Sequence, residues 1–138
     1  MASERVQKLA AAYDLWEQSR GGSIDHWLSL MADEVDFRSL ADDLPQAPFA
    51  QPYKRREDVR KYLEGPAAGW GMLSYRVDRF VEQGDDVVMI GSTAWRNRAT
   101  GKMAETTKVD LWRFKGDKAV GFFELLDTAK VAACCAPD

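Results

Sequence analysis

The chain has 138 residues, of which 46% are hydrophobic and 30% are charged, a balance that is typical of one globular domain and excludes a disordered or membrane-embedded class. Its 19 basic and 22 acidic side chains give a net charge of −3, which offers no electrostatic attraction for nucleic acid or anionic lipid. No apolar stretch has the length of a membrane span and no signal region precedes the first helical pattern, so we expect one cytoplasmic domain over residues 1–138.

The N-terminal segment has the pattern of a helical hairpin. Four apolar side chains recur there at spacings of three and four: Val6, Leu9, Tyr13 and Trp16. They share one face of a helix that we expect from about residue 3 to 19, ending at Gly21-Gly22. Ser23 then offers an N-cap, and helical spacing continues over residues 24–31, which predicts a second, short helix packed against the first.

The segment that follows predicts short elements around a loop. Residues 35–38 have the pattern of a short strand, and the three prolines of residues 42–54 exclude regular structure there, so we expect a loop that can act as a lid. Residues 57–64 have helical spacing and reach Gly65-Pro66, which predicts a third, short helix. A loop through Gly69 and Gly71 is expected next.

The second half of the chain predicts strands. Four are expected, over residues 73–82, 86–96, 102–114 and 118–126, with turns at residues 83–85, 99–101 and 115–117. Such short connections require antiparallel pairing, and strands that follow helices in this way predict an α+β domain with the helices on one face of the sheet. Asp127 is expected to cap a last helical turn.

Two carboxylates interrupt the predicted strands, and a buried carboxylate must be paired, protonated or used chemically. Alternation places Asp110 on the same face as Trp112 and Phe114, so we expect it to point inward. Glu124 lies in a stretch that is apolar on both faces, and a carboxyl group in such surroundings can serve as a general acid or base. A structural ion pair, with Lys108 or Arg76 as the partner, is the alternative.

Other polar side chains are candidate site residues. Tyr13 lies on the apolar face of the first helix, where its hydroxyl needs a partner or must reach the surface. Arg38 must either extend outward or pair with an inward acid. The single His26 and the adjacent Cys134 and Cys135 lack the spacing of a metal site, and no phosphate loop or nucleophile elbow occurs, so we expect neither a metal nor a cofactor.

The order of elements and several local strings resemble the SnoaL-like and ketosteroid isomerase-like group of the nuclear transport factor two-like superfamily. The strings are residues 11–13, 28–35, 109–114 and 123–129, and the resemblance covers nearly the whole chain. It implies a cone-shaped α+β fold: a strongly curved, mostly antiparallel sheet wrapped around a helical hairpin and a third short helix, with an internal apolar pocket. It also implies a homodimer formed through the outer face of the sheet.

The resemblance also implies roles for individual residues. Tyr13 matches the isomerase tyrosine that donates to the substrate oxyanion, and Asp110 matches the protonated aspartate beside it. That isomerase aspartate is a known case of a carboxyl group kept neutral by an apolar site. Glu124 matches an acidic position of the epoxide hydrolase-like and cyclase-like members. Arg38 or Ser39 stands where the isomerase has its general base, so steroid isomerisation is not expected.

Two functions remain open. In the first, a cofactor-free isomerase, lyase, cyclase or hydrolase acts on a small carbonyl compound: Tyr13 and Asp110 stabilise an oxyanion, Glu124 moves the proton and Arg38 orients an anionic group. In the second, the same pocket holds an apolar ligand or partner without reaction. Further pocket contacts are expected from Trp16, Trp112, Phe122 and Leu126. A Glu124 paired with Lys108 in a closed cavity favours binding, and an unpaired Glu124 favours chemistry.

Overall fold

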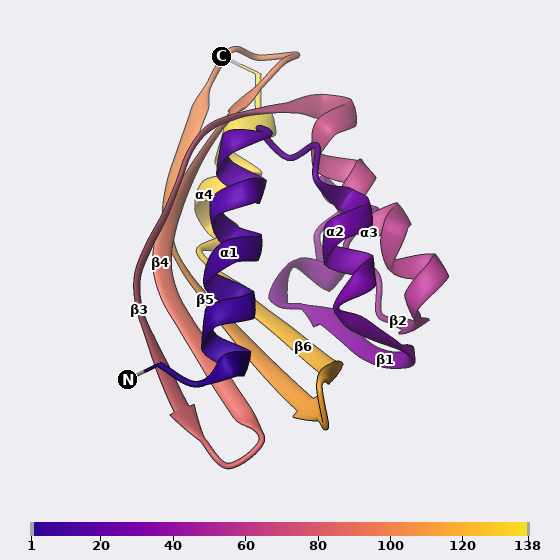
Figure 1. The fold of residues 1–138 in the computed structure, drawn as a ribbon. Helices are drawn as coiled ribbons and strands as arrows, with labels where there is room; N and C mark the ends of the chain where they lie inside the picture. The colour runs from indigo at the N-terminus through magenta and orange to yellow at the C-terminus, as the bar shows by residue number, and fades with distance from the viewer. Residues whose placement is uncertain (1, 138) are drawn as a thin grey trace.

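A curved sheet of six strands runs through the computed structural model, which describes residues 2–137 (Figure 1). The strands are β1 (Met31–Ser39), β2 (Tyr53–Arg55), β3 (Trp70–Gln83), β4 (Asp86–Asn97), β5 (Met103–Lys115) and β6 (Lys118–Leu126). Their order across the sheet is β2-β1-β6-β5-β4-β3. β1 pairs with β6 in parallel, and the other neighbours in this described sheet are antiparallel. The predicted α+β class with a mostly antiparallel sheet is confirmed.

The helices lie on the concave side and at one end of the sheet (Figure 1). They are α1 (Glu4–Gln18), α2 (Ile24–Ser29), α3 (Arg56–Gly69) and α4 (Thr128–Cys135), with a 3-10 helix η1 (Leu40–Asp43) after the first strand. Ser3 caps α1 by accepting from the Val6 N–H, and Asp127 caps α4 by accepting from the Lys130 N–H, as expected for the last helix. The long helix α1 lies along β3, within the curve that the sheet forms.

Three predicted boundaries are wrong. Met31 begins β1 instead of ending the second helix, because its strand pairs with β6 at Ala119. The third helix does not stop at Gly65-Pro66 but continues to Gly69, since the missing N–H of Pro66 costs only one hydrogen bond in the last turn. The N–H of Trp70 still donates to the Pro66 carbonyl, and β3 begins at once, without the expected loop.

Other details of the prediction differ in small ways. Ser23 precedes α2 as expected, but its hydroxyl makes no capping hydrogen bond. The loop expected over residues 42–54 is shorter, residues 44–52, because η1 includes Asp42 and Asp43 and β2 includes Tyr53 and Lys54. Met1 and Asp138, the ends of the predicted domain 1–138, lie outside the described residues. None of the helices within residues 2–137 combines the length and the apolar character that crossing a bilayer requires.

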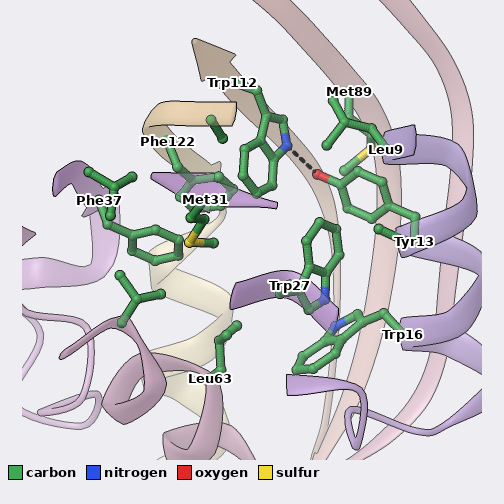
Figure 2. Packing of buried hydrophobic residues seen from close by; sticks show 14 of the residues in the cluster. Leu9, Tyr13, Trp16, Trp27, Met31, Phe37, Leu63, Met89, Trp112 and Phe122 are labelled. Atoms are coloured by element: carbon green, nitrogen blue, oxygen red, sulfur yellow. Dashed lines mark hydrogen bonds between the residues drawn. The ribbon is translucent and has the colours of Figure 1, made fainter. Parts of the chain in front are cut away.

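One aromatic core joins α1 and α2 to the concave face of the sheet (Figure 2). The Trp27 ring of α2 stacks on Trp112 of β5 with ring centres 5.4 Å apart, and the Phe37 ring of β1 stacks on Phe122 of β6 at 4.3 Å. Tyr13 of α1 meets the edge of Trp27. Such ring contacts fix side-chain positions more firmly than aliphatic packing does, so the surface that faces the interior is well defined.

Candidate functional site

A cavity of about 130 Å³ lies between the helices and the concave face of the sheet. Most of its walls are aromatic or aliphatic, which is typical of sites for small organic molecules. Four of its lining residues were predicted from the sequence: Trp16, Trp112, Phe122 and Leu126. Arg38 is not among the lining residues, because its side chain extends from the opposite face of β1 and its guanidinium lies 5.3 Å over the Phe123 ring. The structure therefore does not bring Arg38 to the site.

The proline-containing loop after β1 closes part of the cavity. Ala47, Phe49 and Ala50 of this loop line the cavity. Phe49 packs directly on Gly65 of α3, where an added Cβ would lie 2.2 Å from the ring. Any other residue at position 65 would displace the loop, so the glycine that was expected to end the helix instead permits the close approach of the cover.

Asp110 is the most deeply buried charged side chain of the site, with 1% of its surface exposed. It points inward from β5 on the same face as Trp112, as the alternation predicted. The Tyr13 hydroxyl of α1 donates to its Oδ2 at 2.5 Å. The same Tyr13 oxygen accepts from the indole N–H of Trp112 at 2.9 Å (Figure 2). The structure therefore brings Tyr13 and Asp110 together as expected.

Lys108 connects the two predicted carboxylates. Its Nζ lies 2.9 Å from Oδ1 and 3.0 Å from Oδ2 of Asp110, and 3.3 Å from Oε1 of Glu124. It also donates to the Tyr75 hydroxyl at 2.7 Å. Asp110 and Glu124 are direct partners across β5 and β6, where two like charges would repel. An ammonium between them removes that repulsion.

Glu124 is fully engaged on both oxygens. Its Oε2 accepts from the Ser39 hydroxyl at 2.7 Å and from the hydroxyl of Tyr62 in α3, while Oε1 faces Lys108. Ser39 reaches it because β1 and β6 run in parallel with these two residues in register. Three donor groups from three different elements therefore meet at this one side chain.

The charges of Lys108, Asp110 and Glu124 lie close enough to affect one another. Desolvation raises the pKa of Asp110, and although Lys108 lowers it, the charge of Glu124 raises it again. Desolvation lowers the pKa of Lys108, but the attraction of Asp110 and the other neighbours outweighs this and leaves the pKa well above its usual value. One ammonium balances only one of the two carboxylates, so the pKa of Asp110 is raised above its ordinary value.

The tyrosines of the cluster are neutral at ordinary pH. Burial raises the pKa of Tyr13 and of Tyr62 well above the usual value, and the nearby carboxylates raise it further. Burial is also the main reason why the pKa of Tyr75 is raised. These hydroxyls therefore act as hydrogen-bond donors, and the Tyr75 proton is the least engaged, since its contact with Asp110 is 3.5 Å long.

Four residues of the site were not predicted as ligand contacts or catalytic groups: Ser39, Tyr62, Tyr75 and Lys108, of which Lys108 was predicted only as a possible ion-pair partner of a carboxylate. Lys108 had a usable signal, because it has the same parity as Asp110 and Trp112 along β5 and so had to share their face. The other three depend on how distant elements approach each other. No group of three or more His, Cys, Asp or Glu side chains within residues 2–137 is placed to hold a metal ion.

Comparisons with known proteins agree on the fold. The family model described as a SnoaL-like domain matches residues 9–122. An NTF2-like protein of unknown function from Burkholderia pseudomallei has a TM-score of 0.84 and 21% identity, over 96% of this chain and 98% of that chain. An NTF2-like protein from Burkholderia thailandensis has a TM-score of 0.81 and 22% identity, over 99% and 100%.

A third similar solved structure was crystallised with a small molecule. It is TerC co-crystallised with polyporic acid, with a TM-score of 0.81 and 21% identity, over 96% of this chain and 98% of that chain. A comparison with curated proteins found no significant match. Identities this low establish the shared fold, and the chemistry of the site must be argued from its own residues.

Proposed function

The chain belongs to the SnoaL-like domain family, and from that premise we propose that its cavity binds a small, largely apolar molecule that carries a carbonyl or hydroxyl group. The observation that carries this proposal is the composition of the cavity wall, in which aromatic side chains surround one buried polar cluster. An apolar body would occupy the aromatic part, and the oxygen would lie at the cluster.

The Tyr75 hydroxyl is the best placed donor for the ligand oxygen. Its own oxygen accepts from Lys108, which polarises the O–H bond, and its proton has only the 3.5 Å contact with Asp110. Tyr13 and Tyr62, in contrast, already donate to Asp110 and Glu124. A ligand oxygen near Tyr75 would gain a hydrogen bond without breaking one that the protein already makes.

Binding is proposed ahead of catalysis because Glu124 is paired. Lys108, Ser39 and Tyr62 all contact its oxygens, so a bound molecule would have to compete with these partners for the carboxylate. Cofactor-independent acid/base chemistry is the second candidate, and the raised pKa of the buried Asp110 carboxyl group beside Lys108 and Glu124 favours it. In that case a carbon-bound proton passes to Glu124 while Tyr75 and Lys108 stabilise the oxyanion, and the proton then returns to another carbon.

A titration of tryptophan fluorescence tests the binding proposal, because three of the tryptophans that line the cavity, Trp16, Trp27 and Trp112, surround the expected ligand. Polyporic acid is the first probe, since the relative TerC was co-crystallised with it. Saturable binding to the native chain, lost in Ala104→Leu, which fills the cavity, supports the proposal. Ala11→Leu on the exposed side of α1 is the matched control. Binding that is equal in both variants contradicts it.

We also propose a homodimer through the outer face of the sheet. Six apolar side chains form two rows across β4, β5 and β6 on the side away from the cavity: Val88, Leu111 and Phe123, and Ile90, Val109 and Leu125. None of the six is fully buried, and Leu125 is 37% exposed. A contiguous apolar patch of this kind is typical of a protein interface, and a second copy supplies a complementary one by symmetry.

A further inference from the structure

A second hollow of about 220 Å³ opens beside the cavity, at the end of the molecule where α1 and α3 finish. The two spaces share four walls: Trp16, Leu63, Trp70 and Trp95. The two spaces therefore adjoin at these side chains, and a ligand that reached from one into the other would have to pass between them. The chemistry of the hollow then describes the other end of the ligand.

The described walls of the hollow include two basic residues and no acidic ones. Arg20 and Arg98 line it, and no Asp or Glu does. Within residues 2–137 neither guanidinium forms an ion pair, whereas Arg5 and Arg113 each pair with an aspartate. Two unneutralised cations at a concave surface, in a chain of net charge −3, form a local site of positive potential.

The side chain of Arg20 and the backbone of Arg98 each make a hydrogen bond near the hollow. Arg20 has a left-handed backbone with φ of 53°, a conformation that residues other than glycine rarely adopt. Its Nη1 donates to the Leu73 carbonyl at 2.8 Å. The Arg98 N–H donates to the Gly69 carbonyl at 3.0 Å, which attaches the end of β4 to the end of α3. Most of the guanidinium donors remain available to a bound anion.

We propose that the ligand carries an anionic group, a carboxylate or a phosphonate-like group, which lies between Arg20 and Arg98 while its apolar body lies in the cavity. This inference rests on the proposed function, because it names the substrate class of the same site. Guanidinium groups bind both kinds of anion through paired N–H donors. The protein would then select amphipathic acids over neutral molecules of the same shape.

Three matched probes test this inference by calorimetry: 4-(1-naphthyl)butanoate, its primary amide and the corresponding phosphonate. The native chain is expected to bind the carboxylate about tenfold more tightly than the amide, since two partly exposed charge contacts separate them. The Arg20→Gln/Arg98→Gln double variant should bind acid and amide alike. The Arg79→Gln variant is the control, because Arg79 is an exposed arginine of β3 that lines neither space and its loss should keep the preference.

Each outcome decides between the two proposals. Equal binding of acid and amide by the native chain overturns the anionic inference and leaves the proposed apolar binding intact. Failure of all three probes to bind contradicts both. A carboxylate preference that survives in the double variant also overturns the role of the two arginines. If the phosphonate binds more tightly than the carboxylate and loses this in the double variant, the natural head group is of the phosphate type.

Discussion

The buried face of β5 carries charged side chains, whereas its outer face carries apolar ones. The face toward the helices holds Lys108 and Asp110, which are 8% and 1% exposed. The face toward the outside holds Val109 and Leu111, which are only half-buried. Charge in the interior and hydrocarbon at the surface both cost free energy. Each departure therefore points to a contact outside the single chain: a ligand on the inner face and a second copy on the outer face.

The strongest way to break the inner face is to remove its single cation. Lys108→Met leaves Asp110 and Glu124 opposite each other in an apolar interior, and we expect the free energy of unfolding to fall by about 3 to 5 kcal/mol. Urea denaturation measures it. The triple variant Lys108→Met/Asp110→Asn/Glu124→Gln removes all three charges and should recover much of that loss. If the triple variant is no more stable than the single one, the charges do not act as one cluster.

A smaller effect is expected from the hydroxyl that connects α1 to the cluster. Tyr13→Phe removes a donor from Asp110 and leaves the indole N–H of Trp112 without its acceptor, so unfolding should become easier by about 1 to 3 kcal/mol. Tyr53→Phe is the control, because its hydroxyl donates to a backbone carbonyl in a partly buried position. An equal loss of unfolding free energy in the two variants would contradict a larger contribution from the buried Tyr13 hydroxyl.

The pH dependence of the free energy of unfolding tests whether the pKa of Asp110 is raised in the folded protein. Because the folded pKa of Asp110 is raised above its ordinary value of 3.8, folding favours the protonated form, and its stabilisation is lost as pH rises from about 4 through the folded pKa. The slope from one such group is at most about 1.4 kcal/mol per pH unit. Asp110→Asn should lack this decline, which urea denaturation between pH 4 and 8 measures. Parallel curves for the native chain and the variant would place the proton elsewhere.

The outer face should respond with the smallest change in stability and with a change in assembly. Leu125→Glu is expected to shift the protein from dimer to monomer in light scattering, while the stability of each chain changes by about 0.5 kcal/mol or less. Leu15→Glu is a matched control, since Leu15 of α1 is 38% exposed against 37% for Leu125 and lies outside the six-residue patch. A monomer at every concentration of the native chain contradicts the interface.

Local patterns were enough to predict most of the fold and part of the site. Alternation within one strand placed Asp110 inward, and helical spacing placed Tyr13 on the face that meets it. Both inferences use only the geometry of a single element. The strand and helix that carry these residues were therefore predictable, as was the aromatic character of the wall between them.

The rest of the site depends on pairing between distant segments. Ser39 reaches Glu124 only because β1 and β6 are parallel neighbours in one register, and no short-range pattern specifies that register. Tyr62 reaches the same carboxylate because α3 packs against β1, the neighbour of β6 in the sheet. Arg38 was expected at the site, but the pleat of β1 that turns Ser39 inward turns its neighbour outward.

The central claim is that a ligand oxygen meets the buried cluster inside the aromatic cavity. The most direct measurement is a high-resolution crystal structure of the chain with a bound carbonyl compound of the cavity's size. We predict a ligand oxygen within hydrogen-bond distance of the Tyr75 hydroxyl or Lys108 Nζ, with its apolar body against Trp27 and Trp112. A saturating ligand that lies outside the cavity, or inside it with its oxygen turned away from the cluster, would contradict the account.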